Sequence, residues 1–469
     1  MKKLLIVVCV VCTVAFPLIA GGGQEGAQAS EAGPIEVRVA LPEIVNATFA
    51  EGEDMTDNLW TRRFEEEHNV KVVVEWVSAE YETSLNLAIA AGTLPDMFTA
   101  NPVQFNQLVE ARQLQDVKAA YDAHAASGLR RMMEANQNIV ETTMFDGEML
   151  AVPRLHYGYE TMTPFVWARK DWAQDMGVSE LGSIRDFEMM METFQSEYGA
   201  DFGVMLDQTL RSFFQMSPAW HSYPQLWVEG PDGSIVYGAT LPETRDALAQ
   251  WAQWYEEGFI RPDFATLTTS AMLEDAYNGR AGIYSQQNWA GWQAGADMIR
   301  NQGDETYFIP FDLPSVDGGK VMYPIQFPNN VYSVVRDGYE HPEVLIKLIN
   351  TYVHVLDEAM VQGTMEIEEV LPFNTNDMHH ITGPFKVHFN HYRDVQEVSN
   401  AVATGEEVFN SGNAYIFYNE IRKWLDNQDL VCLGRYIQIG APWSSLVLAL
   451  DHVDNEHLLY DQMWGAPPQ

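Results

Sequence analysis

Aromatic side chains gather in three short segments of this sequence: residues 155–159 (LHYGY), 218–227 (PAWHSYPQLW) and 288–292 (NWAGW). The prolines and glycines among them are typical of loops. A ring on a loop buries a large area at a low entropic cost, so it can stack against the apolar face of a ligand. The candidate rings are Tyr157, Tyr159, Trp220, Trp227, Trp289 and Trp292. Each ring can equally fill the core of the fold, and for Trp292 packing on the helix that follows is the expected alternative.

Four polar residues in predicted loops could fix the orientation of a ligand: Asn101, Arg154, His156 and Asn330. Amide, guanidinium and imidazole groups supply the donors and acceptors that hydroxyl groups of a ligand need. Polar residues at loop ends also cap helices and turns, so a structural role stays open for each of the four.

Histidines cluster near the C-terminus, where His379, His380, His388 and His391 account for four of the 12 in the chain. Neutral imidazole is a good ligand for zinc or nickel. However, the sequence has no H-E-x-x-H pattern, and Gly383-Pro384 interrupts the cluster. We therefore expect these histidines to lie on the surface or in the core, and we expect no metal and no cofactor.

An enzyme that cleaves glycans would also present aromatic rings, together with two facing carboxylates. The chain has 66 acidic residues, so a pair of them can be found almost anywhere and carries little information. Neither a G-x-S-x-G elbow nor a phosphate-binding glycine loop occurs. A secreted glycan-cleaving enzyme therefore remains only as an alternative.

The elements that must position these residues alternate between strands and helices. Alternating or continuous apolar residues predict strands over 35–41, 70–77, 94–98 and 281–284. Helical periodicity predicts helices over 58–67, 81–91, 184–197, 242–257 and 343–356, the second of them ended by Gly92. Such alternation is typical of parallel βαβ units, in which ligands bind at the carboxyl ends of the strands.

The N-terminus predicts export. Lys2 and Lys3 precede an apolar run, and a small residue, Ala20, closes it, so residues 1–20 are predicted to be a signal peptide and 21–34 a flexible tether. Cys9 and Cys12 lie inside the apolar run, too early for attachment of a lipid, so we expect a soluble periplasmic protein. The net charge of −39 argues against binding to nucleic acid.

Five segments, in order, resemble the extracellular solute-binding proteins of family 1, especially their large oligosaccharide-binding branch, which includes alginate-binding members. The segments are residues 90–98 (AAGTLPDMF), 145–153 (FDGEMLAVP), 165–172 (FVWARKDW), 278–284 (NGRAGIY) and 341–343 (HPE). Trp289 falls where this family often places a ring that stacks on a sugar. The alginate-binding members carry a calcium loop, whereas residues 195–203 here are short and lack alternating carboxylates, so we expect no calcium.

The resemblance implies an α/β fold of the periplasmic binding protein type II, with a ligand cleft between two α/β lobes. The lobes are expected at 35–162 plus 314–368 and at 163–313 plus 369–469, with crossings near 160–165, 310–318 and 365–375. The implied function is that of a monomer that captures an oligosaccharide by hinge closure and delivers it to the transmembrane subunits of an ABC importer. Relatives continue beyond a Gly-Ala-Pro segment like Gly465–Pro467, so the second lobe is expected to lack a final packed element.

A binding protein for another solute, such as a peptide or a polyamine, is the remaining alternative. The charges that face the ligand discriminate among these classes. A carboxylate cluster would favour a cation, two or more Arg or Lys would favour an acidic sugar, and stacked rings without excess charge would favour a neutral glycan.

Overall fold

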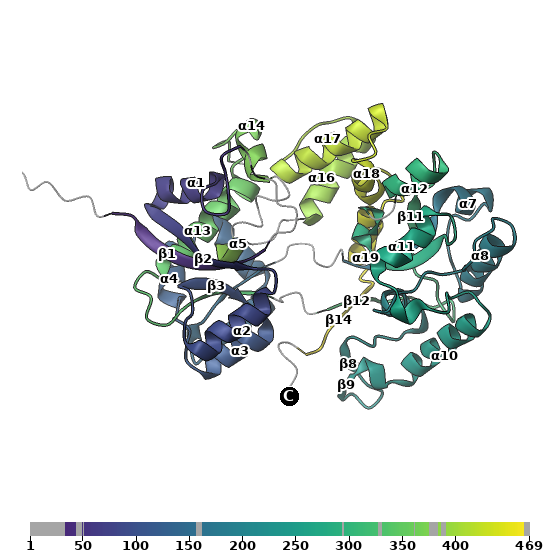
Figure 1. The fold of residues 1–469 in the computed structure, drawn as a ribbon, viewed down its shortest axis with the longest axis horizontal. Coiled ribbons are helices and arrows are strands. Elements are labelled where there is room, and N and C mark those ends of the chain that lie inside the picture. The colour runs from purple at the N-terminus through teal and green to yellow at the C-terminus, as the bar shows by residue number, and fades with distance from the viewer. Residues whose placement is uncertain are drawn as a thin grey trace, which may run out of the picture.

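The computed structural model describes residues 33–43, 49, 51–155, 162–292, 295–326, 331–360, 362–374, 383–385 and 391–463. Figure 1 shows two lobes side by side. The first contains the purple and blue N-terminal elements together with the green helix α13 (Glu343–Val353), which comes from a distant part of the sequence. The second contains the teal elements and the yellow C-terminal helices.

A five-stranded sheet forms the centre of the first lobe, with the order β2-β1-β3-β13-β6. Its strands are β1 (Ile35–Pro42), β2 (Val70–Ser78), β3 (Met97–Ala100), β6 (Val152–Pro153) and β13 (Tyr332–Val335). β1 runs parallel to β2 and β3, and β13 runs antiparallel to β3 and β6. The sheet is therefore mixed, with β13 as its one reversed strand.

The register of this sheet brings the strand ends into one row. Pro42 lies opposite Ser78, and Tyr332 lies opposite both Ala100 and Pro153. The row is the carboxyl end of the four parallel strands and the beginning of β13. β1 runs toward the second lobe in Figure 1, so this row, which we call edge 1, faces that lobe.

Helices cover both faces of the first sheet. One face packs against α1 and α13 around Trp60, Phe64 and Tyr352, and the other packs against α2 and α3 around Phe98 and Phe105. The further elements of this lobe are α1 (Leu59–His68), α2 (Tyr81–Ala91), α3 (Pro102–Glu110), α4 (Lys118–His124), α5 (Ser127–Ala135), α6 (Gln137–Glu141), β4 (Met144–Phe145), β5 (Glu148–Met149), α14 (Ile367–Val370) and the helical turns at His354–Glu358, Leu371–Asn374 and Gly383–Phe385.

The second lobe is built on a three-stranded antiparallel sheet, with β7 (Pro164–Arg169) between β10 (Ile283–Gln287) and β11 (Phe308–Phe311). Gln287 lies opposite Pro164, and Phe311 lies opposite Val166. The beginning of β7 and the ends of β10 and β11 therefore share one edge, which we call edge 2. The chain passes from Leu155, in the core of the first lobe, to Pro164, the first residue of β7, within nine positions, which limits how far apart the two can lie. We therefore take edge 2 to face edge 1.

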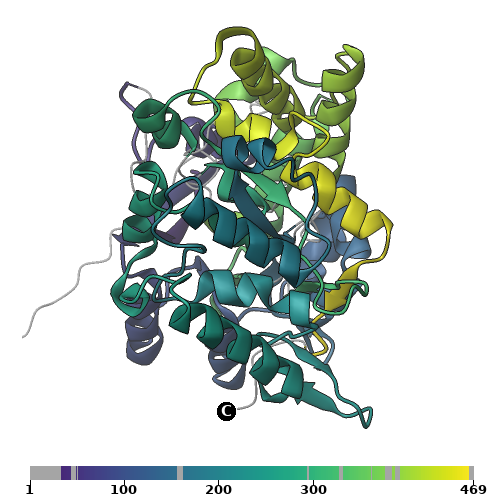
Figure 2. The same ribbon diagram turned by 90° about the vertical axis from the view of Figure 1, so that its right-hand side faces the viewer.

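Helices enclose this second sheet, and Figure 2, which looks onto the outer side of the lobe, shows teal helices in front of the strands. The elements are α7 (Lys170–Asp175), α8 (Ile184–Ser196), α9 (Arg211–Met216), β8 (Trp227–Glu229), β9 (Ile235–Tyr237), α10 (Pro242–Glu256), α11 (Thr269–Tyr277), α12 (Gly295–Gln302), β12 (Tyr323–Ile325), β14 (Leu458–Tyr460) and short turns at Ser217–Trp220, Gly238–Thr240, Phe264–Thr266 and Asn288–Trp292.

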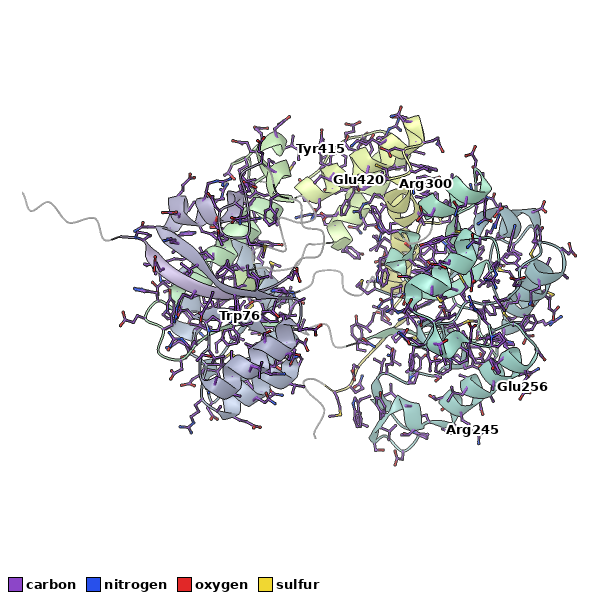
Figure 3. All side chains as sticks on the ribbon, viewed as in Figure 1. Trp76, Arg245, Glu256, Arg300, Tyr415 and Glu420 are labelled. Atoms are coloured by element: carbon purple, nitrogen blue, oxygen red, sulfur yellow. The ribbon has the colours of Figure 1, made fainter. Side chains whose placement is uncertain are left out.

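Four C-terminal helices, α16 (His391–Thr404), α17 (Gly412–Asn427), α18 (Leu433–Ile439) and α19 (Ser445–Asp454), extend the second lobe. α18 and α19 pack on the Asn288–Trp292 turn, whereas α17 also contacts the Leu371–Asn374 turn of the first lobe. Tyr415, which Figure 3 labels, lines a cavity of about 290 Å³ together with Met360 and Met365. These helices thus span both lobes on one side of the molecule.

Local sequence signals placed most of the elements correctly. Asn58 caps α1 by accepting hydrogen bonds from the backbone of Trp60 and Thr61, and Gly92 ends α2 in the left-handed region at φ 67°. The predicted strand at 94–98 begins later, at Met97, because the preceding Pro95 has no N–H to donate.

The packing favours lobe boundaries that differ from the predicted ones. Leu313, Val321 and Tyr323 lie in a core cluster of the second lobe, because β12 pairs with β14 there. Phe373 and Phe385 instead pack into the first lobe beside Trp60. The second and third changes of lobe therefore fall after Ile325 and after Phe385.

A buried carboxylate joins three strands of the first lobe. Asp96, only 4 % exposed, accepts hydrogen bonds from the backbone N–H of Arg38 (3.0 Å) and from Nη2 of Arg336 (2.8 Å). Burial alone would raise the pKa of Asp96, but the bonds from Arg38 and Arg336 outweigh it and hold that pKa below its ordinary value.

Replacing this carboxylate should destabilise the fold in a pH-dependent way. Because the folded-state pKa is lowered, the stabilisation is present above the unfolded-state pKa and is lost as the pH falls through the folded-state value. We expect Asp96→Asn to lower the free energy of unfolding by about 2–3 kcal/mol at pH 7, with the difference shrinking below pH ~4. Denaturant unfolding measures both quantities. The control is Asp297→Asn, whose exposed pair with Arg300 should contribute under about 1 kcal/mol. Equal decreases in the free energy of unfolding for the two variants would contradict the stabilising role of the buried Asp96 carboxylate.

Candidate functional site

Edge 1 carries a group of polar and aromatic side chains. Tyr81 begins α2, and its hydroxyl donates to the carbonyl of Thr99 (3.0 Å) and accepts from the Thr99 backbone N–H (3.2 Å). Trp76, two residues before the end of β2, lies 5.4 Å from the ring of Tyr81 and is half-buried. Figure 3 labels Trp76 in the first lobe. The strand ends thus hold two rings close together at this edge.

Arg154 follows β6 directly and is the cation of edge 1. Its backbone N–H donates to the carbonyl of Val331 (3.0 Å), which fixes its place beside the beginning of β13. Its side chain is only partly exposed, and its Nε is buried without a hydrogen-bond partner. Burial lowers the pKa of the guanidinium, and the nearby hydroxyls of Tyr352 and Tyr81 raise it to a smaller extent. A desolvated guanidinium with unused donors is a site for an acceptor.

Asn101 lies beside these residues, but its side chain has a structural role. It caps α3 by accepting a hydrogen bond from the backbone N–H of Gln104 (2.9 Å), while the Gln104 side chain accepts from the N–H of Asn101 (3.2 Å). This capping box accounts for the carboxamide oxygen of Asn101. Of the two roles that the sequence left open for this residue, capping is the one that the contacts show.

Edge 2 carries Trp289, in the turn that follows β10. The ring is half-buried, and its Nε1 donates to Oε1 of Gln287 (3.1 Å). The guanidinium of Arg211 lies over the same ring, 5.9 Å from its centroid. Arg211 begins α9, which is fixed against β10 because the backbone N–H of Ser285 donates to Oγ of Ser212 (3.2 Å). A half-exposed ring and a cation thus lie together at the end of β10.

Trp292 packs on α18, a helix far along the chain. The Arg435 guanidinium lies 4.9 Å from the Trp292 ring centroid, and a side chain at Gly434 would collide with that ring. Arg435 is in turn held by Oε2 of Glu420 (2.9 Å). Trp292 still exposes 43 % of its surface, but its contacts are those of a residue that joins helices.

Trp220 is a core residue, which corrects its prediction as a ligand contact. It is 5 % exposed and lies edge-on to Trp254, with ring centroids 5.7 Å apart. Trp220 therefore belongs to the core cluster of the second lobe. Trp227 is half-buried in β8, and its ring packs at 5.4 Å from that of Tyr237 in the adjacent β9.

Several predicted residues lie outside the described residues: His156, Tyr157, Tyr159, Asn330, and three of the clustered histidines, His379, His380 and His388. Within the described ranges no three His, Cys, Asp or Glu side chains come together in a group that could hold a metal ion. The predicted roles of the four ligand candidates among them stay predictions.

Sequence reasoning missed Trp76, Tyr81 and Arg211. Trp76 and Tyr81 could have been found, because one ends a predicted strand and the other begins the helix after it, at the edge where ligands bind. Arg211 gave no comparable signal. Its significance depends on which acidic side chains surround it in space, and the sequence does not give this.

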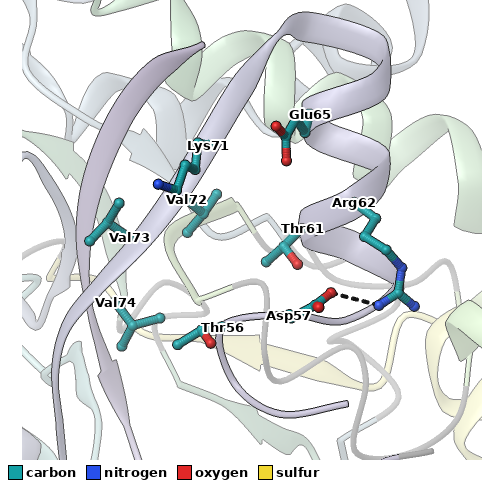
Figure 4. Close-up of a pocket in the computed structure, with 9 residues that line it drawn as sticks. All are labelled: Thr56, Asp57, Thr61, Arg62, Glu65, Lys71, Val72, Val73 and Val74. Atoms are coloured by element: carbon teal, nitrogen blue, oxygen red, sulfur yellow. Dashed lines mark hydrogen bonds and ion pairs between the residues drawn. The ribbon is translucent and has the colours of Figure 1, made fainter. Parts of the chain in front are cut away.

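A cavity of about 460 Å³ lies elsewhere in the first lobe, between α1 and β2 (Figure 4). Its cations are already paired, since Arg62 contacts Asp57 (2.7 Å) and Lys71 contacts Glu36 (3.1 Å). All of its lining residues come from the first lobe, so closure of the two lobes would not change it. We therefore place the candidate site at the facing edges and not in this cavity.

A model of the bacterial extracellular solute-binding protein family matches residues 60–335, more than half of the chain. The chain belongs to this family. The matched range includes edge 2, most of edge 1 and four of the five segments that carried the resemblance in the sequence, and the predicted family is confirmed. Members of the family and the similar solved structures are substrate-binding proteins and not enzymes.

Solved structures similar to this solute-binding protein share its fold at low sequence identity. Alginate-binding protein AlgQ2 is 13 % identical, with a TM-score of 0.56 over 92 % of this chain and 84 % of that one. FusA of S. pneumoniae, solved with kestose, is 15 % identical, with a TM-score of 0.56 over 90 % and 95 %. These likenesses confirm the periplasmic-binding-protein-like α/β fold.

A curated relative, lipoprotein LipO of Bacillus subtilis, is 21 % identical over 319 residues. The match covers 65 % of this chain and 57 % of LipO, so the chain spans little more than half of that relative's length.

The different burial of two tryptophans gives a direct stability test. We expect Trp220→Ala to lower the free energy of unfolding by about 3–5 kcal/mol, because it leaves a cavity in a packed core. Trp289→Ala should cost under about 1 kcal/mol, since its ring is half-exposed at the end of a strand. Denaturant unfolding of both variants makes the comparison, and similar losses would refute the assignment of Trp220 to the core and Trp289 to the surface of the site.

Proposed function

We propose that this solute-binding protein captures an oligosaccharide between edges 1 and 2 and delivers it to the transmembrane subunits of an ABC importer. The observation that carries the proposal is the half-exposed Trp289 ring at the end of β10, on the edge that faces the first lobe. Sugars present C–H faces that stack on such rings, and their hydroxyls require polar groups nearby. Similar structures named for alginate, kestose and human milk oligosaccharide binding support the same class of ligand.

The proposed mechanism is closure of the lobes without chemistry. The lobes would rotate about the three crossings, which we place between Leu155 and Thr163, between Ile325 and Tyr332, and between Phe385 and Tyr392. Edge 2 would then bring Trp289 against a ligand held at edge 1. Affinity would reflect a shift of population toward the closed state, which is the state that a permease recognises.

Several further side chains belong to the proposed site. Tyr157, Tyr159, His156 and Asn330 are proposed as contacts because their segments adjoin edge 1, and Trp227 because its ring is half-exposed. Trp292 is not included among the proposed ligand contacts, because its ring packs on α18. Trp76 and Tyr81 are added, because they place a second aromatic surface at edge 1.

The protein is proposed to act as a monomer in the periplasm after removal of residues 1–20. In the described part of the chain, no helix is both long and apolar enough to cross a membrane. The lipoprotein relative makes lipid attachment the competing possibility. Phase partitioning of the exported protein in Triton X-114 distinguishes the two, because a lipid-anchored form enters the detergent phase; we expect the aqueous phase, and the detergent phase would overturn this part of the proposal.

Screening the protein for binding to a panel of oligosaccharides tests the proposed function. The panel holds kestose, maltose, human milk oligosaccharides and alginate oligomers, and thermal shift identifies the ones that raise the melting temperature. For a sugar that binds, Trp289→Ala should weaken affinity by about 1–3 kcal/mol in calorimetry, because a buried stacking surface is lost.

The matched control is Trp292→Ala, which removes a ring from the same turn but one that packs on α18. Equal affinity of the Trp289→Ala variant and the unchanged protein would remove Trp289 from the site. Chromatography of the sugars after incubation with the protein should show no cleavage products. Products that form with the protein and are absent from an incubation without it would favour an enzyme. Stabilisation by a peptide or polyamine and by no sugar would favour the alternative solute.

A further inference from the structure

Basic side chains in this protein are outnumbered by acids, 27 to 66, and most of those in the described ranges form an ion pair with a carboxylate. Within the described ranges, six have no carboxylate within ion-pairing distance: Arg112, Arg130, Arg154, Arg211, Lys320 and Lys423. Arg130 and Lys320 donate to backbone carbonyls instead. Arg112 and Lys423 are exposed to water.

Arg154 and Arg211 are the two that remain. Both are partly buried, and in the described part of the chain neither side chain donates a hydrogen bond. Arg154 lies at edge 1 and Arg211 at edge 2, so each lobe contributes one such cation to the facing edges. In a chain of this composition, two unpaired cations at the facing edges of two lobes require an explanation.

Leaving a guanidinium partly buried and unpaired is unfavourable, because water no longer solvates it fully and no acceptor replaces the water. Arg130 and Arg435 show how the same chain satisfies partly buried guanidinium groups elsewhere, with carbonyls in one case and with Glu420 in the other. An anion that arrives with a ligand would supply the missing acceptors. Arginine suits this role, since its planar donors bind two oxygens of a carboxylate at once.

The net charge of −39 does not oppose such binding. Charges separated by more than about 10 Å are largely screened at physiological salt. The net charge of the whole chain is therefore no argument against an anion that contacts either guanidinium group directly. The phenol hydroxyls of Tyr81 and Tyr352 beside Arg154 are uncharged at neutral pH, since burial raises the pKa of both.

We propose that the ligand is an acidic oligosaccharide, whose carboxylate groups are bound by Arg154 from the first lobe and Arg211 from the second. A uronate unit would stack on Trp289 while its carboxylate contacts Arg211, because the cation and the ring lie 5.9 Å apart. Binding would neutralise one cation on each lobe and so favour the closed arrangement over the open one. This inference rests on the proposed function and narrows its class of ligand.

The test compares acidic oligosaccharides with their carboxyl-reduced derivatives, in which each carboxylate becomes a CH2OH group and the length and linkages are unchanged. Oligogalacturonates and alginate oligomers serve as the uronates, and a sulfated oligosaccharide distinguishes sulfate esters from carboxylates. Calorimetry should show binding of a uronate that weakens about 10- to 100-fold on carboxyl reduction, as expected for a lost charge-assisted hydrogen bond. Affinity should also fall as salt rises.

Arg154→Gln and Arg211→Gln should each weaken uronate binding about 10- to 100-fold and leave binding of the reduced derivative nearly unchanged. The control is Arg245→Gln, which removes an exposed cation, labelled at the lower edge of the second lobe in Figure 3, with no effect on either ligand. Thermal melts confirm folding of each variant. The comparison of ligands on the unchanged protein needs no variant, so the proposal stays testable even if one variant does not fold.

The outcomes separate this inference from the proposed function. Tight binding of neutral sugars, with equal affinity in the Arg154→Gln, Arg211→Gln and Arg245→Gln variants, would overturn the acidic ligand and leave the oligosaccharide function standing. Preference for the sulfated ligand would overturn the choice of carboxylate. Binding of no sugar of either kind would overturn both proposals.

Discussion

The register of the first sheet is the constraint on which the arrangement of the site depends. Parallel strands end at the same edge of a sheet, and here the pairings of Pro42 with Ser78 and of Tyr332 with Ala100 and Pro153 align five strands in one row. Asp96 reinforces this alignment, because it ties Arg38 in β1 to Arg336 just after β13. Side chains that follow these strands are then close to one another, whatever their distance in sequence.

In the second lobe a smaller sheet likewise brings strand ends together at one edge. Its antiparallel sheet places the end of β10 beside the beginning of β7, and α9 is held against β10 through Ser212 and Ser285. Most tryptophans of this lobe fill its core, as Trp167, Trp220 and Trp254 do. Trp289 differs because β10 ends before it, at Gln287. Its ring therefore lies at edge 2, where fewer side chains surround it and it stays half-exposed. The division between core rings and site rings therefore follows from where strands end.

Local signals in the sequence predicted much of the fold. The cap at Asn58, the left-handed Gly92 and the βαβ alternation each act within a few residues, so they can be read directly. Prediction failed where the outcome depends on distant contacts. Trp220 has a loop-like neighbourhood but packs on Trp254, and the pairing of β12 with β14 draws residues 313–325 into the second lobe. Arg211 was missed for the same reason, since the absence of a partner is a property of the whole fold.

Small-angle X-ray scattering of the protein, alone and saturated with an oligosaccharide that thermal shift has identified, tests the central claim that a ligand is held between the two edges by closure. The account predicts a smaller radius of gyration with the ligand than without it, and a smaller change for the Trp289→Ala variant at the same ligand concentration because less of it is bound. Identical scattering curves at full occupancy of the binding site would contradict it.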